Sequence, residues 1–159
     1  QFKIMKIHKA LKVKNRLANQ LAQLQAIFQR ENSRRDDNAS TVDRLDVYKK
    51  IQQTFDKLVD LKAAIVQASA PVAHELAQLT ELKSYITFIR GLPTRKGEEV
   101  GYVGQNAEKI VHTWSAQLDR EQVDFETASI QSKIDGLQDR IDSFNAQTEV
   151  LYTEEAKSE

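Results

Sequence analysis

Glycine and proline are scarce in this 159-residue chain, and their scarcity limits its fold more than any other feature. The sequence holds five glycines and two prolines, and four of the glycines fall between Gly91 and Gly104, together with Pro93. The rest is rich in residues compatible with helices and has few residues that end strands. The sequence therefore predicts an all-α fold, an antiparallel helical bundle or coiled coil of about four helices, with a Gly-rich loop or small hairpin before the last helix.

Apolar residues at helical spacing predict two helices in the first half of the chain. The first runs from about Lys6 to Arg34, and a polar loop follows it. The second is capped by Ser40 with Asp43, or by Thr41 alone. Its apolar residues follow one another at intervals of three or four: Leu45, Tyr48, Ile51, Phe55, Leu58, Leu61 and Ile65.

A third helix is predicted after the Ala70-Pro71 pair, because proline disfavours the helical conformation in the preceding residue and suits the first turn of a new helix. Gly91 caps this helix at its C-terminal end. The Gly-rich loop covers residues 91–105 and includes the only segment with strand or hairpin potential, around Val100 and Tyr102.

The last helix is predicted from residue 106 to residue 152. In its second half, apolar residues alternate at intervals of four and three, which is typical of a coiled-coil seam. The seam residues are Ile130, Ile134, Leu137, Ile141, Phe144, Thr148 and Leu151. The first half follows another frame, so we expect a break or a change of partner between about Ser115 and Val123. A helix of this length would span roughly 65–70 Å and extend past its neighbours. We therefore expect the seam to pair with a second subunit in a homo-oligomer.

The length suits a single helical domain over residues 1–159, in which Met5 looks like the natural start and residues 1–4 an addition. No apolar run reaches the roughly 18–20 residues of a membrane span, and no signal-peptide core is visible. The absence of cysteine excludes disulfides, zinc–thiolate sites, iron–sulfur clusters and cysteine nucleophiles. We expect a cytoplasmic protein.

Acidic and basic residues balance at 23 each, which argues against general binding to nucleic acid or to an anionic membrane. The first sixteen residues hold six bases and no acid, whereas residues 119–159 hold eleven acids and four bases. A nucleic-acid arm or a membrane-surface helix is one interpretation of the basic end. The favoured interpretation is that the first and last helices lie antiparallel, so that these charges compensate each other.

One end of the predicted bundle collects residues that suit an anionic ligand. Antiparallel helices bring the loops after the first and third helices to the same end, beside the start of the last helix. Arginine forks, backbone amides freed by glycine, and flat aromatic side chains are what a phosphate- or nucleotide-like ligand needs. The candidate ligand-binding residues are Arg30, Arg34, Arg35, Arg90, Arg95, Lys96, Tyr102, His112 and Trp114.

Acids in the same loops support the opposite interpretation, because they can neutralise these cations as ordinary surface ion pairs. They are Asp36, Asp37, Glu98 and Glu99. Both interpretations stay open at this point.

No catalytic or metal-binding motif is visible in the sequence. His8, His74 and His112 are too far apart for a local metal motif, and there is no Gly-x-Ser-x-Gly elbow, phosphate-binding Walker loop or dinucleotide fingerprint. The adjacent carboxylate pairs fall in loops or at the end of the chain. We expect neither an enzyme nor a bound metal or cofactor.

Three stretches, Leu58–Ile65, Glu75–Lys83 and Ile130–Leu151, resemble the small all-helical proteins often labelled septicolysin, which are found in bacteria and have relatives expected in phages. Departures from that pattern are the Gly91–Gly104 segment and Ala68–Pro71, where the family tends to have asparagine and threonine. The resemblance implies a helical hairpin assembly that oligomerises, with no settled activity. The toxin suggested by the family's name is not supported, since no helix combines a strongly apolar face with an uncompensated basic face.

Two functions follow from these observations. The first is a non-enzymatic, homo-oligomeric binding protein that captures a small anionic, nucleotide-like ligand at the Arg-rich loop end. In a phage, such a protein would suit a sponge that sequesters a host defence signal. The alternative is a structural or scaffolding coiled-coil protein with no small-molecule ligand. Neither function involves nucleic acid or a membrane.

Overall fold

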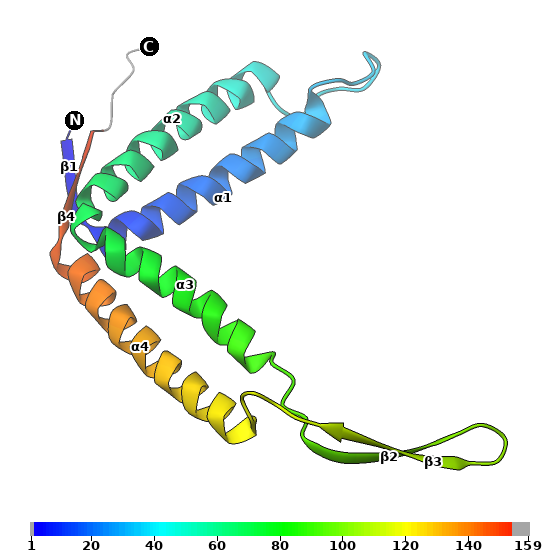
Figure 1. Cartoon of the computed structure of the whole chain (residues 1–159). Helices are drawn as coiled ribbons and strands as arrows, with labels where there is room; N and C mark the ends of the chain where they lie inside the picture. The colour runs from blue at the N-terminus through cyan, green and yellow to red at the C-terminus, as the bar shows by residue number, and fades with distance from the viewer. Residues whose placement is uncertain (1, 154–159) are drawn as a thin grey trace. The chain divides into compact units, whose positions relative to one another are not determined.

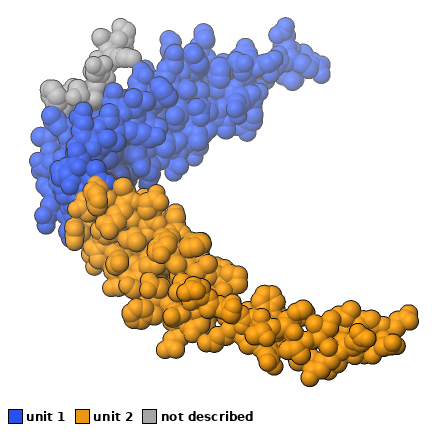
Figure 2. All heavy atoms as spheres, viewed as in Figure 1, with its two compact units in different colours: residues 1–73, 142–159 blue, residues 74–141 orange. Residues whose placement is uncertain are grey.

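The computed structural model describes residues 2–153. The chain forms two compact units (Figures 1 and 2). Unit 1 comprises residues 1–73 and 142–159, and unit 2 comprises residues 74–141. The elements in chain order are β1 (Phe2–Lys6), α1 (Ile7–Glu31), α2 (Arg44–Ala68), the 3-10 turn η1 (Ala70–Val72), α3 (Ala73–Arg90), β2 (Gly97–Val103), β3 (Glu108–Trp114), α4 (Arg120–Gln147) and β4 (Glu149–Thr153).

The prediction of an all-α helical bundle is wrong. The chain forms two separate two-stranded antiparallel sheets, β1 with β4 and β2 with β3, so the fold mixes helices and strands. The helices form two pairs in different units, α1 with α2 and α3 with α4, and not one four-helix bundle. The sequence reading missed β1 and β4 because each is only five residues long, and its partner lies at the opposite end of the chain.

In unit 1 the sheet packs into the core beside the helical hairpin. Opposite residues share a face in an antiparallel pair, and the pair Met5 and Val150 belongs to the same apolar cluster as Ile7 and Leu61. Ile7, Leu61 and Val150 are the largest fully buried side chains among the described residues. The sheet therefore joins the two ends of the chain to the α1–α2 hairpin (Figure 1).

The ion pair between Lys6 and Glu149 lies at the same junction, with 3.0 Å between Lys6 Nζ and Glu149 Oε1. Lys6 also donates to the main-chain oxygen of Gln147, at 2.9 Å. The sequence predicted charge compensation between the first and last helices, whereas this pair joins the strands β1 and β4.

The second predicted helix is α2, and Asp43 is its N-cap. The Asp43 carboxylate accepts hydrogen bonds from the main-chain N–H groups of Leu45 and Asp46, at 3.0 and 3.1 Å. These bonds satisfy two of the donors that a helix start leaves without a partner.

The long helix predicted for residues 106–152 is also wrong. Residues 108–114 form β3, α4 begins only at Arg120, and residues 149–153 form β4. Asp119 and Gln122 explain the late start. The Asp119 carboxylate accepts from the Gln122 N–H at 3.0 Å, and the Gln122 side chain accepts from the Asp119 N–H at 2.9 Å. This reciprocal pair is a capping box, so it fixes the helix start at that point.

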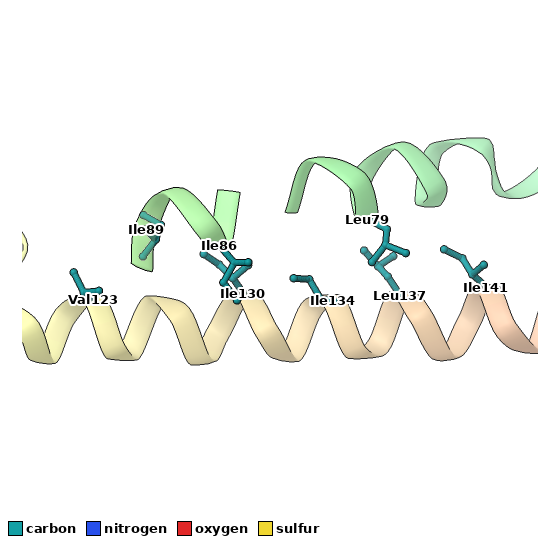
Figure 3. Close-up of a cluster of buried hydrophobic side chains, with 8 residues drawn as sticks. All are labelled: Leu79, Ile86, Ile89, Val123, Ile130, Ile134, Leu137 and Ile141. Carbon is teal, nitrogen blue, oxygen red and sulfur yellow. The ribbon is translucent and has the colours of Figure 1, made fainter. Parts of the chain in front are cut away.

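Unit 2 has a core that is one layer thick, between α3 and α4 (Figure 3). The apolar residues of α4 in this layer meet those of α3 within the same chain. The buried residues of the layer, from both helices, are Leu79, Ile86, Ile89, Val123, Ile130, Ile134, Leu137 and Ile141. The central residues of the predicted intersubunit seam are therefore buried inside unit 2, and the argument for a second subunit at this seam no longer holds.

The Gly-rich segment and the start of the predicted last helix form a β-hairpin instead. Gly104 adopts a positive φ of 79° at the turn between β2 and β3, a conformation that glycine accepts without a steric penalty. Within residues 2–153, no helix has both the length and the apolar character that crossing a membrane requires.

Candidate functional site

The predicted ligand site is divided between the two units. Arg30, Arg34 and Arg35 belong to unit 1, and the other six residues belong to unit 2: Arg90, Arg95, Lys96, Tyr102, His112 and Trp114. The site depended on a four-helix bundle with its loops at one end, and that bundle does not form.

In unit 1, Arg34 and Arg35 form ion pairs within the α1–α2 loop. Arg34 pairs with Glu31, which is in the last turn of α1, and also donates to the main-chain oxygen of Ala39. Arg35 pairs with Asp37. Arg34 thus holds the loop against the end of α1, and its half-buried side chain serves the fold.

In unit 2, Arg95, Glu99 and Trp114 lie together at the base of the β-hairpin. The guanidinium carbon of Arg95 is 4.6 Å from the centre of the Trp114 ring, which is a cation–π contact. Arg95 also pairs with Glu99 at 2.5 Å, and the Trp114 indole N–H donates to the same carboxylate at 2.9 Å. The Glu99 carboxylate therefore binds Arg95 and Trp114, two of the residues that were expected to bind a ligand.

The same contacts lower the pKa of Glu99 below its ordinary value. The hydrogen bond from Trp114 is the largest cause, the hydrogen bond from Arg95 follows, and the charges of Arg95 and His112 add to both. Each of these interactions favours the ionised carboxylate. Glu99 is accordingly an anion at neutral pH and remains paired with Arg95.

Lys96 is paired in the same way, with 3.1 Å between its Nζ and the Asp119 carboxylate. The pKa of Asp119 is lowered, first by the hydrogen bond from the Gln122 main chain and then by that from Lys96. Arg90 donates a hydrogen bond to the side-chain oxygen of Gln131 in α4, at 3.4 Å.

Tyr102 and His112 lie on opposite faces of the hairpin. The register places Tyr102 opposite Lys109 and His112 opposite Glu99, and side chains alternate between the faces along each strand. His112 therefore shares the face of Glu99, whereas Tyr102 does not. Of the candidate cations, Arg34, Arg35, Arg95 and Lys96 each form an ion pair with a carboxylate of the same chain.

The outer face of α2 carries a feature that the sequence reading did not separate. The predicted apolar stripe divides in two, because Leu58, Leu61 and Ile65 are buried while Leu45, Tyr48 and Phe55 are exposed. We define the outer seam as the exposed positions at alternating intervals of three and four residues: Leu45, Tyr48, Gln52, Phe55, Val59, Lys62 and Val66.

The outer seam and the buried face are two separate stripes on one helix. The positions of the buried face, at intervals of four and three, are Val47, Ile51, Thr54, Leu58, Leu61 and Ile65, of which Ile51 is half-buried and the others are buried. Each residue turns an α-helix by about 100°, and each outer position from 48 onward follows a position of the buried stripe, so the two stripes lie roughly 100° apart around α2. Five of the seven outer positions are large and apolar, and two of them, Leu45 and Val66, are 74% and 69% exposed. α1 covers the buried stripe and reaches the outer seam only at Tyr48, whose ring centre lies 5.3 Å from that of Phe28. The rest of the outer seam can pack against a second partner.

Within residues 2–153, no three His, Cys, Asp or Glu side chains cluster closely enough to hold a metal ion. No family model, curated protein or solved structure matches this chain. The resemblance to septicolysin-like proteins therefore stays a prediction.

Proposed function

We propose that this protein is a self-associating structural protein whose subunits pair through the outer seam of α2. The observation that carries the proposal is the second, exposed heptad stripe on a helix whose first stripe is already buried. Burying apolar surface stabilises by about 25 cal/mol per Å², so a row of five exposed apolar side chains favours association. Coiled-coil pairing is the usual way in which such a stripe is covered.

A second copy of α2, lying antiparallel, fits the seam in one register. When residue numbers in the two copies add to 114, Tyr48 meets Val66 and Phe55 meets Val59 of the other copy. The two polar positions of the seam, Gln52 and Lys62, then meet each other. Every apolar residue of the outer seam from Tyr48 to Val66 is thus opposite an apolar residue. Lys62 of one copy reaches the side-chain oxygen of Gln52 in the other.

Other arrangements leave poor contacts. A parallel pair in register places two Lys62 side chains opposite each other, and like charges at a seam repel. In the neighbouring antiparallel register, with numbers that add to 107, Lys62 packs on Leu45 and Gln52 packs on Phe55. Both polar groups would lose water without gaining a partner. Charge and polarity therefore select the first register.

Capture of a small anionic ligand by the loops is the less favoured function. Arg34, Arg35 and Arg95 each pair with a carboxylate of the same chain, so a ligand would have to compete with these contacts.

Sedimentation velocity over a range of concentrations tests the proposed self-association. The wild type should sediment as a dimer or a larger oligomer, and Phe55→Lys should be a monomer because it places a charge at the centre of the seam. Phe125→Lys is the matched control, since Phe125 is exposed on α4 and lies outside the seam. A monomeric wild type, or a Phe55→Lys variant that associates as the wild type does, would contradict the proposal.

A further inference from the structure

A second surface of unit 1 combines positive charge with an apolar floor. A groove of about 590 Å³ runs beside α1, and residues of β1, α2 and β4 complete its walls. Its volume is within the range of roughly 300–1,000 Å³ that is typical of small-molecule sites. All of its lining residues belong to unit 1, so its shape depends on that unit alone.

Four cationic side chains line the groove, and no carboxylate does. They are Lys3, Lys9, Arg16 and Lys57. The first acid in the whole sequence is Glu31, so α1 offers no local anion to this surface. Within the described residues, neither Lys9 nor Arg16 has a carboxylate within ion-pair distance, in contrast to the loop arginines. The positive charges of Lys9 and Arg16 are thus not neutralised by a carboxylate within residues 2–153.

The floor of the groove is aliphatic. Met5, Val13 and Leu17 line it, and all three are half-buried against the unit 1 core. Tyr152 is the only aromatic residue in the lining; its ring is buried, and its hydroxyl lies 3.4 Å from the main-chain oxygen of Lys57. No exposed aromatic plane is present on which a nucleobase would stack, so a flexible alkyl chain fits this floor better than a nucleotide does.

We propose that this groove binds an amphiphilic anion, an alkyl or acyl chain that ends in a carboxylate or phosphate group. Lys9 and Arg16 are seven residues apart on α1, or about 10.5 Å along its axis, so their long side chains can approach one head group from either side. The arginine fork matches carboxylate and phosphate oxygens, and the lysine adds a point charge. The chain lies over Met5, Val13 and Leu17 and removes apolar surface from water.

Amide NMR with decanoate and with decyl phosphate, each below the concentration at which it aggregates, tests the proposal. We expect saturable shifts in residues of α1, β1 and β4, with smaller changes in α3 and α4. The two probes show whether the groove prefers a carboxylate or a phosphate. The neutral alcohol 1-decanol has a chain of the same length, and we expect its affinity to be lower than that of the anions by a factor of about ten or more.

Paired variants separate a site from general attraction to a basic helix. Lys9→Gln with Arg16→Gln should weaken binding about tenfold, and each single variant should lose part of that affinity. Lys12→Gln with Lys14→Gln removes the same charge from the same helix outside the groove and should leave affinity nearly unchanged. Overturning results would be no saturable binding of either anion, equal binding of 1-decanol, or an equal loss in the control variant. The measurements can be made in Phe55→Lys, so they do not depend on the proposed self-association.

Discussion

Units 1 and 2 are built from the same parts, a pair of helices and a two-stranded sheet, but the sheet serves a different purpose in each. In unit 1, Val150 and Tyr152 of β4 are buried against the helices. In unit 2, no residue of the β2–β3 hairpin is fully buried. A sheet can therefore close a core or can extend from it, and only the first use adds apolar burial to the stability of the unit.

The helix pairs differ in a similar way. The Cα atoms of α1 and α2 approach within 8 Å along the pair, whereas those of α3 and α4 hardly do. Ala10, Ala64 and Ala68 lie in or against the unit 1 cluster, and small side chains allow helices to approach. The unit 2 layer consists of Leu, Ile and Val, which hold the helices further apart. We therefore expect unit 1 to be the more tightly packed and the less tolerant of truncation.

The largest effect should come from truncating the same residue type in each core. Leu61 is completely buried in unit 1, and Leu137 is 8% exposed in the thin layer of unit 2. We expect Leu61→Ala to lower the free energy of unfolding by about 4 kcal/mol and Leu137→Ala by about 2 kcal/mol, because a cavity in a thin layer collapses or fills with water more easily. Urea unfolding followed by circular dichroism, at one protein concentration, measures both. Equal losses, or a larger loss for Leu137→Ala, would contradict the difference between the units.

A smaller effect should separate the two sheets. Val150 is fully buried in β4, whereas Val111 of β3 is 47% exposed. Removing two methyl groups should cost about 2 kcal/mol for Val150→Ala and under about 0.5 kcal/mol for Val111→Ala. The same unfolding measurement applies. If Val111→Ala were the more costly variant, the hairpin would have to contribute to a core that the structure does not show.

The smallest effect concerns the hairpin's own polar contact and its response to pH. The pKa of Glu99 is lowered from an ordinary value of 4.5, so the ionised contact stabilises the hairpin above that pH. That stabilisation is lost as the pH falls through the lowered pKa of the folded state. Trp114 is the only tryptophan, and its fluorescence should titrate with a midpoint below pH 4.5.

Two variants check the assignment of that titration. Glu99→Gln should abolish it, because the amide does not ionise. Glu98→Gln should leave it unchanged, since Glu98 lies on the opposite face of the hairpin. A midpoint at or above pH 4.5, or a titration that survives in Glu99→Gln, would show that the contact does not form in solution.

The sequence predicted elements better than it predicted partners. Asp43 was expected to cap α2 together with Ser40, and it is the N-cap itself. The helix α4 begins at Arg120, inside the interval where a break was expected. Periodicity shows that a helix has an apolar stripe, but it does not show which surface covers that stripe. The seam from Ile130 to Ile141 was therefore assigned to a second subunit, although α3 of the same chain covers it.

Some of the missing information was present in the sequence and some was not. The capping box at Asp119 and Gln122 marks the true start of α4 and could have been read. The second stripe on α2 could also have been separated, because Phe55 and Leu58 belong to different heptad frames. The pairing of β1 with β4 could not be predicted from the sequence, since it joins short strands at opposite ends of the chain. Asp37 and Glu99 were among the acids expected to neutralise the loop cations, and they pair with Arg35 and Arg95. The partners of Arg34 and Lys96, Glu31 and Asp119, became known only from the structure.

Cysteine cross-linking tests the central claim, the antiparallel pairing of α2, most directly. The chain has no native cysteine, so a Gln52→Cys protein and a Lys62→Cys protein can each be cross-linked without background. The proposed register places positions 52 and 62 of different copies opposite each other, whereas two copies of position 62 are about 15 Å apart along the axis. We predict rapid disulfide formation when the two proteins are mixed and little in either protein alone. Rapid cross-linking of Lys62→Cys with itself, or no cross-linking in the mixture, would contradict the account.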